Sequence, residues 1–495
     1  MYNLMDNGYI DVTTKKEINY WCLYDWANSP ISSPILAMIV PLLIERLSTQ
    51  NVCESVQCNS DGDPIDGSEK YLNGLGITPN TFAFFIIGIS VFLQAVSFIS
   101  FCSYADYENH RKKMFKYTAL LGSITTMLFL FCTNDSLWWL VGVLTIFVNI
   151  FFGLSIVFYN AYLPLMVHSH EDYIKAKRDD PQSGQAEEDR IINEISTKGI
   201  TIGYFGGLIV TFIVFVVIYF YPHADSNYDN IETNWSLVIS IFIAGVWWFI
   251  FTLVSYSQMK DRSGPKYEST DNIIIFSWKR TISTIKDLKN HYQMKKYIIS
   301  YFLFSDAYST IGGVGILYAK TELNVSENIL AIIVIEVTIF AIIGNILFLY
   351  IQKKFNISSK TILVIQLYIL MFLCLFGIII LDGKTPLVLT FGAIYGLLIG
   401  TSQSYSRSLF TQLIPMGYES QYFSLYEISD KSSSSIGPLI MAVISQYTSL
   451  RYGFIYIIFV TCLSIPILKS VNFEKKETPQ EQGSDQDLIF DPMDI

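Results

Sequence analysis

The chain has few charged residues for its length. Only 15% of its 495 residues are Asp, Glu, Lys or Arg, whereas 51% are apolar. A water-soluble protein of this size carries about 25% charged residues. This shortage excludes an ordinary soluble globular fold and makes the lipid bilayer the main solvent of the chain.

The signatures of common enzyme sites are also missing from the sequence. It contains only five histidines, no C-x-x-C pair and no H-E-x-x-H sequence, so we expect neither a metal nor a redox site. We find no nucleophile–base pair, no phosphate-binding loop and no basic stripe outside short loops. We therefore expect no enzyme activity, no cofactor and no nucleic-acid partner.

A secretory signal peptide is not apparent either, because the first 19 residues are polar and the first apolar run is too long for one. The apolar runs are about 20 residues long and do not alternate, which favours spanning helices over barrel strands. We predict an all-α membrane protein with about twelve spans. These are residues 27–47, 81–102, 114–133, 137–163, 199–221, 235–256, 297–319, 329–351, 361–381, 386–412, 423–447 and 452–469.

Basic residues gather in alternate loops, as in Arg111–Lys113 and in the long segment 257–296. The positive-inside rule then places both termini in the cytosol. Two six-helix halves joined by a cytosolic linker match the plan of the major facilitator fold. We expect an amphipathic helix in the linker near Ile282–Tyr292. The expected divisions are residues 1–26 (cytosolic N-terminus), 27–256 (first half), 257–296 (linker), 297–470 (second half) and 471–495 (disordered tail).

Two kinds of modification are expected in the loops on the opposite side. Cys53 and Cys58 lie in one polar loop, where a disulfide is plausible if the loop is lumenal. Asn234 and Asn324 begin N-x-S sequences and are candidate glycosylation sites, although Asn234 lies close to the membrane.

The segment YWCLYDWANSP, residues 20–30, carries an acid and an amide to the edge of the first span. Such groups are costly there unless a partner or an aqueous cavity meets them. We predict that Asp25 and Asn28 belong to a cytosolic gate. Arg407, near the end of the tenth span, either extends toward the cytosolic surface or joins this gate.

The loop CSYADYENHRKK, residues 102–113, supplies two further gate candidates, Asp106 and Arg111. It resembles the acid-and-base loop between the second and third helices of major facilitators, although the glycines of that loop are absent. Membrane topology alone explains the bases but does not explain Asp106.

Three carboxylates fall inside predicted spans, at Asp306, Glu336 and Asp430. Buried carboxyl groups suit proton transfer or the binding of a substrate ammonium group. A structural hydrogen bond is the alternative for each of them. We expect Glu427 and Lys431, four residues apart on one helix face, to neutralise each other, which leaves Asp430 without an evident local partner.

Gly199, Gly203 and Gly207 recur every four residues in the fifth span. Glycines at this spacing let a second helix approach closely, so we predict a helix-packing stripe.

Several of these blocks together resemble the vacuole effluxer family, the autophagy-related amino acid exporters of the major facilitator superfamily. The matching elements are YDWANS at 24–29, FYNAYLP at 158–164, the glycine-rich 196–207 and the block 402–438; FSDA at 304–307 departs from the family pattern. The resemblance implies export of amino acids from the lumen of a vacuole or lysosome to the cytosol, as part of autophagic recycling. Because an acidic lumen would supply a proton gradient, we expect secondary transport by alternating access that is coupled to protons. The alternative is a membrane receptor or scaffold that retains the transporter fold.

Overall fold

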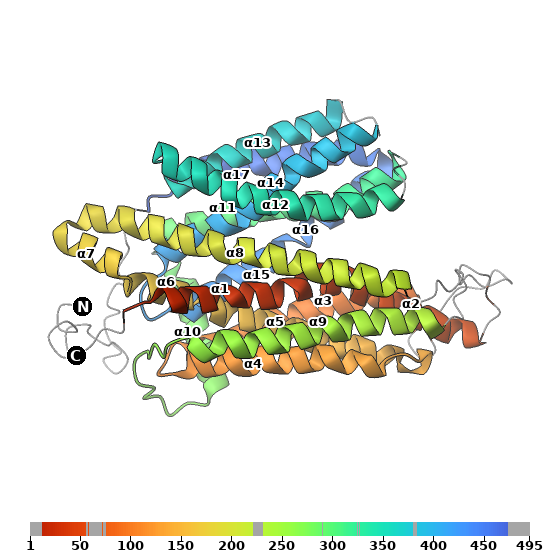
Figure 1. Cartoon of the computed structure of the whole chain (residues 1–495), viewed down its shortest axis with the longest axis horizontal. Coiled ribbons are helices and arrows are strands. Elements are labelled where there is room, and N and C mark those ends of the chain that lie inside the picture. The colour runs from red at the N-terminus through yellow and green to blue at the C-terminus, as the bar shows by residue number, and fades with distance from the viewer. Residues whose placement is uncertain are drawn as a thin grey trace.

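The computed structural model describes residues 12–473, apart from residues 56–57, 59–71, 73–75, 221–230, 290, 324, 326 and 380–383. The described residues form a bundle of long helices that lie nearly parallel to one axis (Figure 1). Ten of the described helices are long and apolar enough to cross a membrane. The chain is therefore a multi-pass membrane protein.

The first half of the bundle contains the helices up to Gln258. They are α1 (Lys15–Pro30), the π-helix η2 (Ile31–Ile39), α2 (Val40–Ser55), α3 (Pro79–Ala105), α4 (His110–Leu128), η3 (Phe129–Phe131), η4 (Asp135–Leu137), α5 (Trp138–Asn160), α6 (Tyr162–His168), α7 (Glu171–Asp179), α8 (Pro181–Phe220) and α9 (Ile231–Gln258).

The linker helix and the second half complete the described chain. They are α10 (Ile273–Asp287), α11 (Tyr292–Thr321), α12 (Glu327–Phe355), α13 (Ser359–Ile379), α14 (Thr385–Leu413), α15 (Glu419–Ser433), α16 (Ile436–Tyr447), η5 (Leu450–Tyr452) and α17 (Gly453–Ser470).

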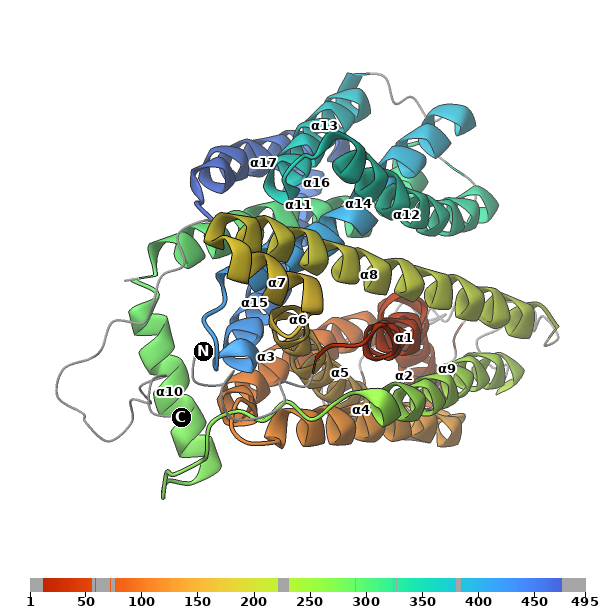
Figure 2. The same ribbon diagram turned by 60° about the vertical axis from the view of Figure 1, so that its left-hand side comes forward.

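The two halves lie side by side along the bundle, and α8 runs between them (Figures 1 and 2). It packs against α1 and α9 of its own half and against α12 and α14 of the other half. We call the end of the bundle that carries α7 and α10 the linker end. Helices α1 and α8 both begin there, so residues early in each helix lie near the linker end.

Two spans begin earlier than the sequence indicates. The first helix begins at Lys15 rather than near residue 27, so the expected N-terminal segment 1–26 ends inside α1. Thr14 caps it by accepting the N–H of Glu17, and the Glu17 carboxylate pairs with Arg262 of the linker at 2.9 Å. These polar contacts extend the helix beyond its apolar part. Helix α8 likewise begins at Pro181, 18 residues before the predicted start.

Two other spans are interrupted. The predicted span 423–447 is split at Ser434–Ser435 into α15 and α16. The first span becomes a π-helix after Pro30, and Pro34 lies inside that π-helix. Proline has no N–H, so each proline leaves a carbonyl of the preceding turn without its usual partner. Trp247 donates its indole N–H to one such carbonyl, that of Trp26, at 3.0 Å.

Candidate functional site

Arg407 of α14 forms the inner ion pair between the halves. Its two terminal nitrogens each lie 3.2 Å from Asp25 Oδ2 on α1. Its Nε donates to Ser196 Oγ at 2.9 Å and its Nη2 donates to Ser196 O at 2.8 Å, both on α8. Nη1 also donates to Asn160 Oδ1 at 3.3 Å. All of these partners belong to the first half, so a side chain of the second half is held inside the first.

Aromatic side chains enclose this pair on the side of the first half. Tyr159 donates its hydroxyl to Asp25 Oδ2 at 2.8 Å, and its ring stacks on Trp21 at 4.3 Å between centroids. The guanidinium of Arg407 lies 5.1 Å from the ring centre of Trp21, within the range of a cation–π interaction. Asp25 and Arg407 are both buried, so each charge depends on the other.

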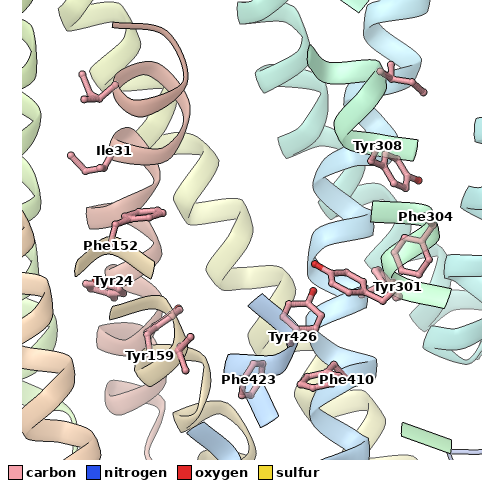
Figure 3. Close-up of a cluster of buried hydrophobic side chains, with 14 of the residues drawn as sticks. Tyr24, Ile31, Phe152, Tyr159, Tyr301, Phe304, Tyr308, Phe410, Phe423 and Tyr426 are labelled. Atoms are coloured by element: carbon pink, nitrogen blue, oxygen red, sulfur yellow. The ribbon is translucent and has the colours of Figure 1, made fainter. Parts of the chain in front are cut away.

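A second aromatic cluster lines the facing surface of the second half. Tyr301 of α11 stacks on Tyr426 of α15 at 4.2 Å, and Phe410 of α14 lies 4.8 Å from Tyr426. Figure 3 shows these rings across from Tyr24 and Tyr159 of the first half. Large rigid rings therefore lie on both sides of the boundary between the halves.

An outer charged cluster lies nearer the linker end. Arg111 Nη2, at the start of α4, lies 2.8 Å from Asp106 Oδ1 and 2.8 Å from Glu419 Oε2. Arg111 Nε donates to Ser420 Oγ at 3.2 Å. Glu419 and Ser420 begin α15 of the second half, so this cluster also joins the two halves. All four side chains are buried.

Asp106 also caps the N-terminus of α15. Its Oδ1 accepts the backbone N–H of Ser420 at 2.8 Å, and its Oδ2 accepts that of Gln421 at 3.1 Å. The first N–H groups of a helix have no partner within the helix, and the helix dipole favours an anion at that position. An acid of the first half thus satisfies a helix end of the second half.

Arg280 of the linker helix α10 extends these contacts across the boundary. Its guanidinium lies 4.8 Å from the ring centre of Tyr107 and 4.4 Å from that of Tyr418. Its Nε donates to Gln421 Oε1 at 3.1 Å, and Gln421 donates back to Arg280 O at 3.1 Å. Burial lowers the pKa of Arg280. One arginine of the linker is therefore clamped between a tyrosine of each half.

A third set of contacts was missed by the sequence analysis. Asn193 of α8 donates to Gln352 of α12, and Tyr405 donates to the same Gln352 oxygen at 2.8 Å. Asp189 of α8 accepts from Gln412 of α14 at 2.8 Å. Asp189 and Asn193 lie in the part of α8 before residue 199, which the sequence analysis assigned to a loop. These polar side chains stabilise the extension of α8 by bonding to α12 and α14, and a run of polar residues before an apolar span is the pattern that could have indicated it.

A cavity of about 450 Å³ lies between the halves, beyond the inner ion pair. Ser29 follows Asp25 by one helical turn, which places the near wall of the cavity next to that pair. The polar side chains that line it include Ser29, Ser33 and Tyr204 from the first half and Tyr308, Tyr395 and Gln403 from the second. Tyr204 donates to Gln403 Oε1 across the boundary at 2.9 Å.

None of the described residues that line this cavity has an ionised side chain. The predicted substrate or proton residues Asp306, Glu336 and Asp430 are not among its lining residues. Glu336 Oε2 is buried without a hydrogen-bond partner, close to Gly392 of the cavity wall. In this conformation the cavity therefore offers hydroxyl, amide and backbone groups rather than carboxylates.

The other two acids are held by neighbouring helices. Asp306 accepts the N–H of Gly437, at the start of α16, at 2.8 Å and the hydroxyl of Tyr456 at 2.6 Å. Asp430 Oδ1 accepts the hydroxyls of Tyr301 at 2.7 Å and Ser305 at 2.6 Å.

The interpretation that Asp430 has no local partner is therefore wrong. The ion pair of Lys431 is with Asp430, at 3.8 Å, rather than with Glu427. Glu427 instead lies 3.5 Å from the Asn160 amide nitrogen of the first half.

The predicted glycine stripe divides into two parts. A Cβ on Gly199 would lie 2.3 Å from Asp25 Oδ2, and one on Gly203 would lie 2.5 Å from Ser29 Oγ. Both glycines therefore allow α8 to approach α1. Gly207 has no atom within 4 Å of its Cβ position and lines the cavity, so its assignment to packing is wrong. Gly206 takes its place, because its Cβ position lies 2.6 Å from Trp26 O.

The structure also locates the remaining predicted residues. Asn28 is buried on α1, three residues after Asp25, and belongs to neither charged cluster. A disulfide joins Cys53 and Cys58. Asn234 is buried and bonded to Arg46, Gln50 and Thr133, so it is a structural residue rather than an accessible glycan acceptor. Asn324 lies outside the described residues.

The sequence of this chain is similar to those of known proteins. Residues 13–481 match the family model described as "Vacuole effluxer Atg22 like". The chain belongs to this vacuole effluxer family. "Autophagy-related protein 22-1" of Penicillium rubens is 27% identical, covering 94% of this chain and 91% of that relative. "Autophagy-related protein 22" of Botryotinia fuckeliana is 28% identical, covering 94% and 81%.

Solved structures show the same fold. A major facilitator superfamily transporter, FucP, in the outward conformation aligns with a TM-score of 0.59 at 13% identity, covering 90% of this chain and 99% of FucP. Family and fold together make the effluxer a membrane transporter with the major facilitator fold and not an enzyme.

Proposed function

We propose that this effluxer exports amino acids from the lumen of the vacuole to the cytosol by alternating access. The observation that carries the proposal is the closed linker end beside a cavity between the halves. Two buried ion clusters and the Arg280 clamp seal one end of the boundary, while the cavity lies beyond them. Rocking of the halves that separates these contacts would open the cavity at the linker end.

The charge pattern of the loops supports the direction of transport. Basic residues concentrate at the linker end, which the positive-inside rule places in the cytosol. Both termini then lie in the cytosol, and the conformation described here faces the lumen. In this conformation the ion pairs close the cytosolic end, and an amino acid would enter the cavity from the lumen.

The size and chemistry of the cavity suit a small zwitterion. Its volume of about 450 Å³ falls within the range of about 300–1,000 Å³ that is typical of small-molecule sites. The described lining residues carry no carboxylate, so hydroxyl and carbonyl oxygens would hold the substrate ammonium group. The π-helix η2 contains Ser33 of the cavity lining, and Pro34 inside it supplies no N–H to the preceding turn. The carbonyl freed by Pro30 is bonded to Trp247 instead.

We further propose that a proton accompanies the substrate, because an acidic lumen supplies the gradient. Asp306 and Glu336 are the candidate carriers that we favour. Asp306 connects α11 to the N-terminus of α16, and one oxygen of Glu336 lacks a partner near the cavity wall. Asp430 is a weaker candidate, because it lies in the contact between α11 and α15, where Tyr301 and Ser305 donate to it and Lys431 pairs with it, and it does not reach the cavity wall.

Efflux of labelled amino acids from right-side-out vacuolar vesicles tests the proposal. Gly207→Leu should fill the cavity and reduce efflux at least tenfold. Gly88→Leu is the matched control, because Gly88 also has no atom within 4 Å of its Cβ position but lies exposed on α3. Wild-type efflux no faster than that of vesicles lacking the protein would favour a receptor or scaffold. Equal efflux from the wild type and both variants would show that the substrate does not use this cavity. Efflux that does not change with lumenal pH would exclude proton coupling but would leave amino acid export standing.

A further inference from the structure

The linker helix α10 has an unusual distribution of side chains. The side turned toward the bundle is mostly polar, because Ser277, Thr281 and Thr284 are buried there together with Phe276. Its apolar face is exposed instead. Ile273 is exposed at the first position of the helix, and the five further exposed apolar residues are Ile274, Ile275, Trp278, Ile282 and Ile285. At 3.6 residues per turn these five side chains fall within an arc of about 100°.

The position of α10 explains this inverted pattern. Trp278 donates its indole N–H to Ser100 Oγ at 3.0 Å, and Thr281 lies 3.0 Å from Ser103 Oγ. Both serines belong to α3, a helix long and apolar enough to cross a membrane, which ends at Ala105. Ser100 lies five residues before that end, which is about 7.5 Å along the helix. Helix α10 thus lies beside the last turns of a membrane span and across the bundle axis (Figure 2).

We propose that α10 is a membrane-surface helix that inserts its apolar face into the leaflet at the linker end and binds anionic lipid headgroups. Helices of this kind bury their apolar face about 5–10 Å into the boundary between headgroups and acyl chains, which matches the depth of Ser100. A tryptophan at this level is typical of membrane interfaces. Left in water, the five apolar side chains would form an unfavourable exposed patch.

Charge selects anionic lipid for the headgroup contacts. Lys279, Lys286 and Lys289 are exposed at the rim of the apolar face. Asp271 pairs with Lys279 at 2.7 Å, and Asp287 is the acid within α10 itself. Cations next to an apolar stripe attract the negative surface of a cytosolic leaflet. Because Arg280 on the opposite face is clamped between the two halves, docking of α10 also fixes the linker relative to the bilayer.

The experiment measures the depth of α10 in reconstituted full-length protein and does not depend on the transported substrate. A nitroxide is attached to Ile285→Cys in a Cys462→Ser background, which removes the exposed free cysteine; the four other free cysteines are buried. Lys175→Cys on α7 is the control, because Lys175 is exposed at the linker end and away from α10. Collision rates with oxygen and with a water-soluble nickel chelate are compared for both positions.

We expect oxygen to dominate at position 285 and the nickel chelate to dominate at position 175. Adding phosphatidylserine to phosphatidylcholine vesicles should raise the oxygen preference at position 285. Neutralising Lys279, Lys286 and Lys289 with glutamine should remove that increase. Nickel-chelate access at position 285 equal to that at position 175 would overturn membrane docking and indicate a surface for a protein. An oxygen preference that is indifferent to lipid charge would overturn the anionic-lipid assignment.

Discussion

Arg407 and Asp25 form an ion pair across the two halves in which both terminal nitrogens of the arginine lie 3.2 Å from the same carboxylate oxygen. Removing one partner leaves a buried charge without compensation, which costs about 3–5 kcal/mol. We expect Arg407→Gln and Asp25→Asn each to lower the Tm of the purified protein substantially. The double variant should be more stable than the sum of the single losses indicates, because it leaves no lone charge. Strictly additive losses in thermal unfolding would contradict the pairing.

The outer cluster should control access from the linker end. In Asp106→Asn, the amide group replaces a carboxylate that now accepts from Arg111 and from two N–H groups of α15. We expect a Ser420→Cys reporter, buried in the closed form, to react several-fold faster with a maleimide in the Asp106→Asn background. Asp261→Asn is the control, because Asp261 is an exposed acid that pairs with nearby Lys112. Equal rates in the two backgrounds would show that the Asp106 contacts do not hold the boundary closed.

Arg280 should stabilise the closed boundary through its shape as well as its charge. A lysine at this position keeps the charge but loses the planar group between Tyr107 and Tyr418, where each stack is worth about 0.5–2 kcal/mol. We expect Arg280→Lys to accelerate labelling of the same Ser420→Cys reporter. Lys279→Arg, on the exposed part of the same helix, should leave the rate unchanged. Equal labelling rates in the Arg280→Lys and Lys279→Arg variants would show that only the charge of Arg280, and not its planar shape, matters.

The glycines of α8 should differ in their tolerance of a methyl group. A Cβ on Gly199 would lie 2.3 Å from Asp25 Oδ2, whereas one on Gly207 meets no atom within 4 Å. Overpacking of this kind costs about 1–3 kcal/mol. Gly199→Ala should therefore lower the Tm, and Gly207→Ala should preserve or raise it. A stable Gly199→Ala protein would mean that the contact between α1 and α8 relaxes easily.

Asp306 should affect proton coupling more than folding. In Asp306→Asn the amide oxygen retains the bond to the Gly437 N–H, and the amide nitrogen donates to the Tyr456 hydroxyl. We expect folded protein whose efflux no longer responds to lumenal pH. Tyr456→Phe keeps the carboxyl group and should keep the response. A normal pH response in Asp306→Asn would leave Glu336 as the favoured carrier.

The sequence predicted the helical membrane fold, because composition and apolar length report directly on the bilayer. It also singled out Asp25, Asp106, Arg111 and Arg407 as charges that need partners. It did not reveal which charges pair, since the Asp25–Arg407 contact joins positions 382 residues apart. The cavity was also hidden, because its described lining consists of hydroxyl, amide and apolar residues that look ordinary in a span.

The predicted starts of α1 and α8 were wrong because these helices continue beyond the lipid, where polar contacts with other elements stabilise them. Thr14 and Glu17 extend α1, and Asp189 and Asn193 extend α8, because they bind other elements at the linker end. Hydropathy measures contact with lipid, so it ends a helix at the membrane surface. The stabilising partners beyond that surface come from distant parts of the chain.

The placement of Arg407 inside the first half also bears on biogenesis. During synthesis the nine predicted spans that precede residues 386–412 enter the membrane before residue 407 has left the ribosome. Until then, the Asp25 carboxylate and the Ser196 backbone carbonyl lack the guanidinium that later joins them. The amino-terminal half then has all of its spans in the membrane, but the buried carboxylate of Asp25 still lacks its arginine partner. Its maturation waits for the tenth span, and truncated chains that stop before α14 should be recognised by quality control as unassembled.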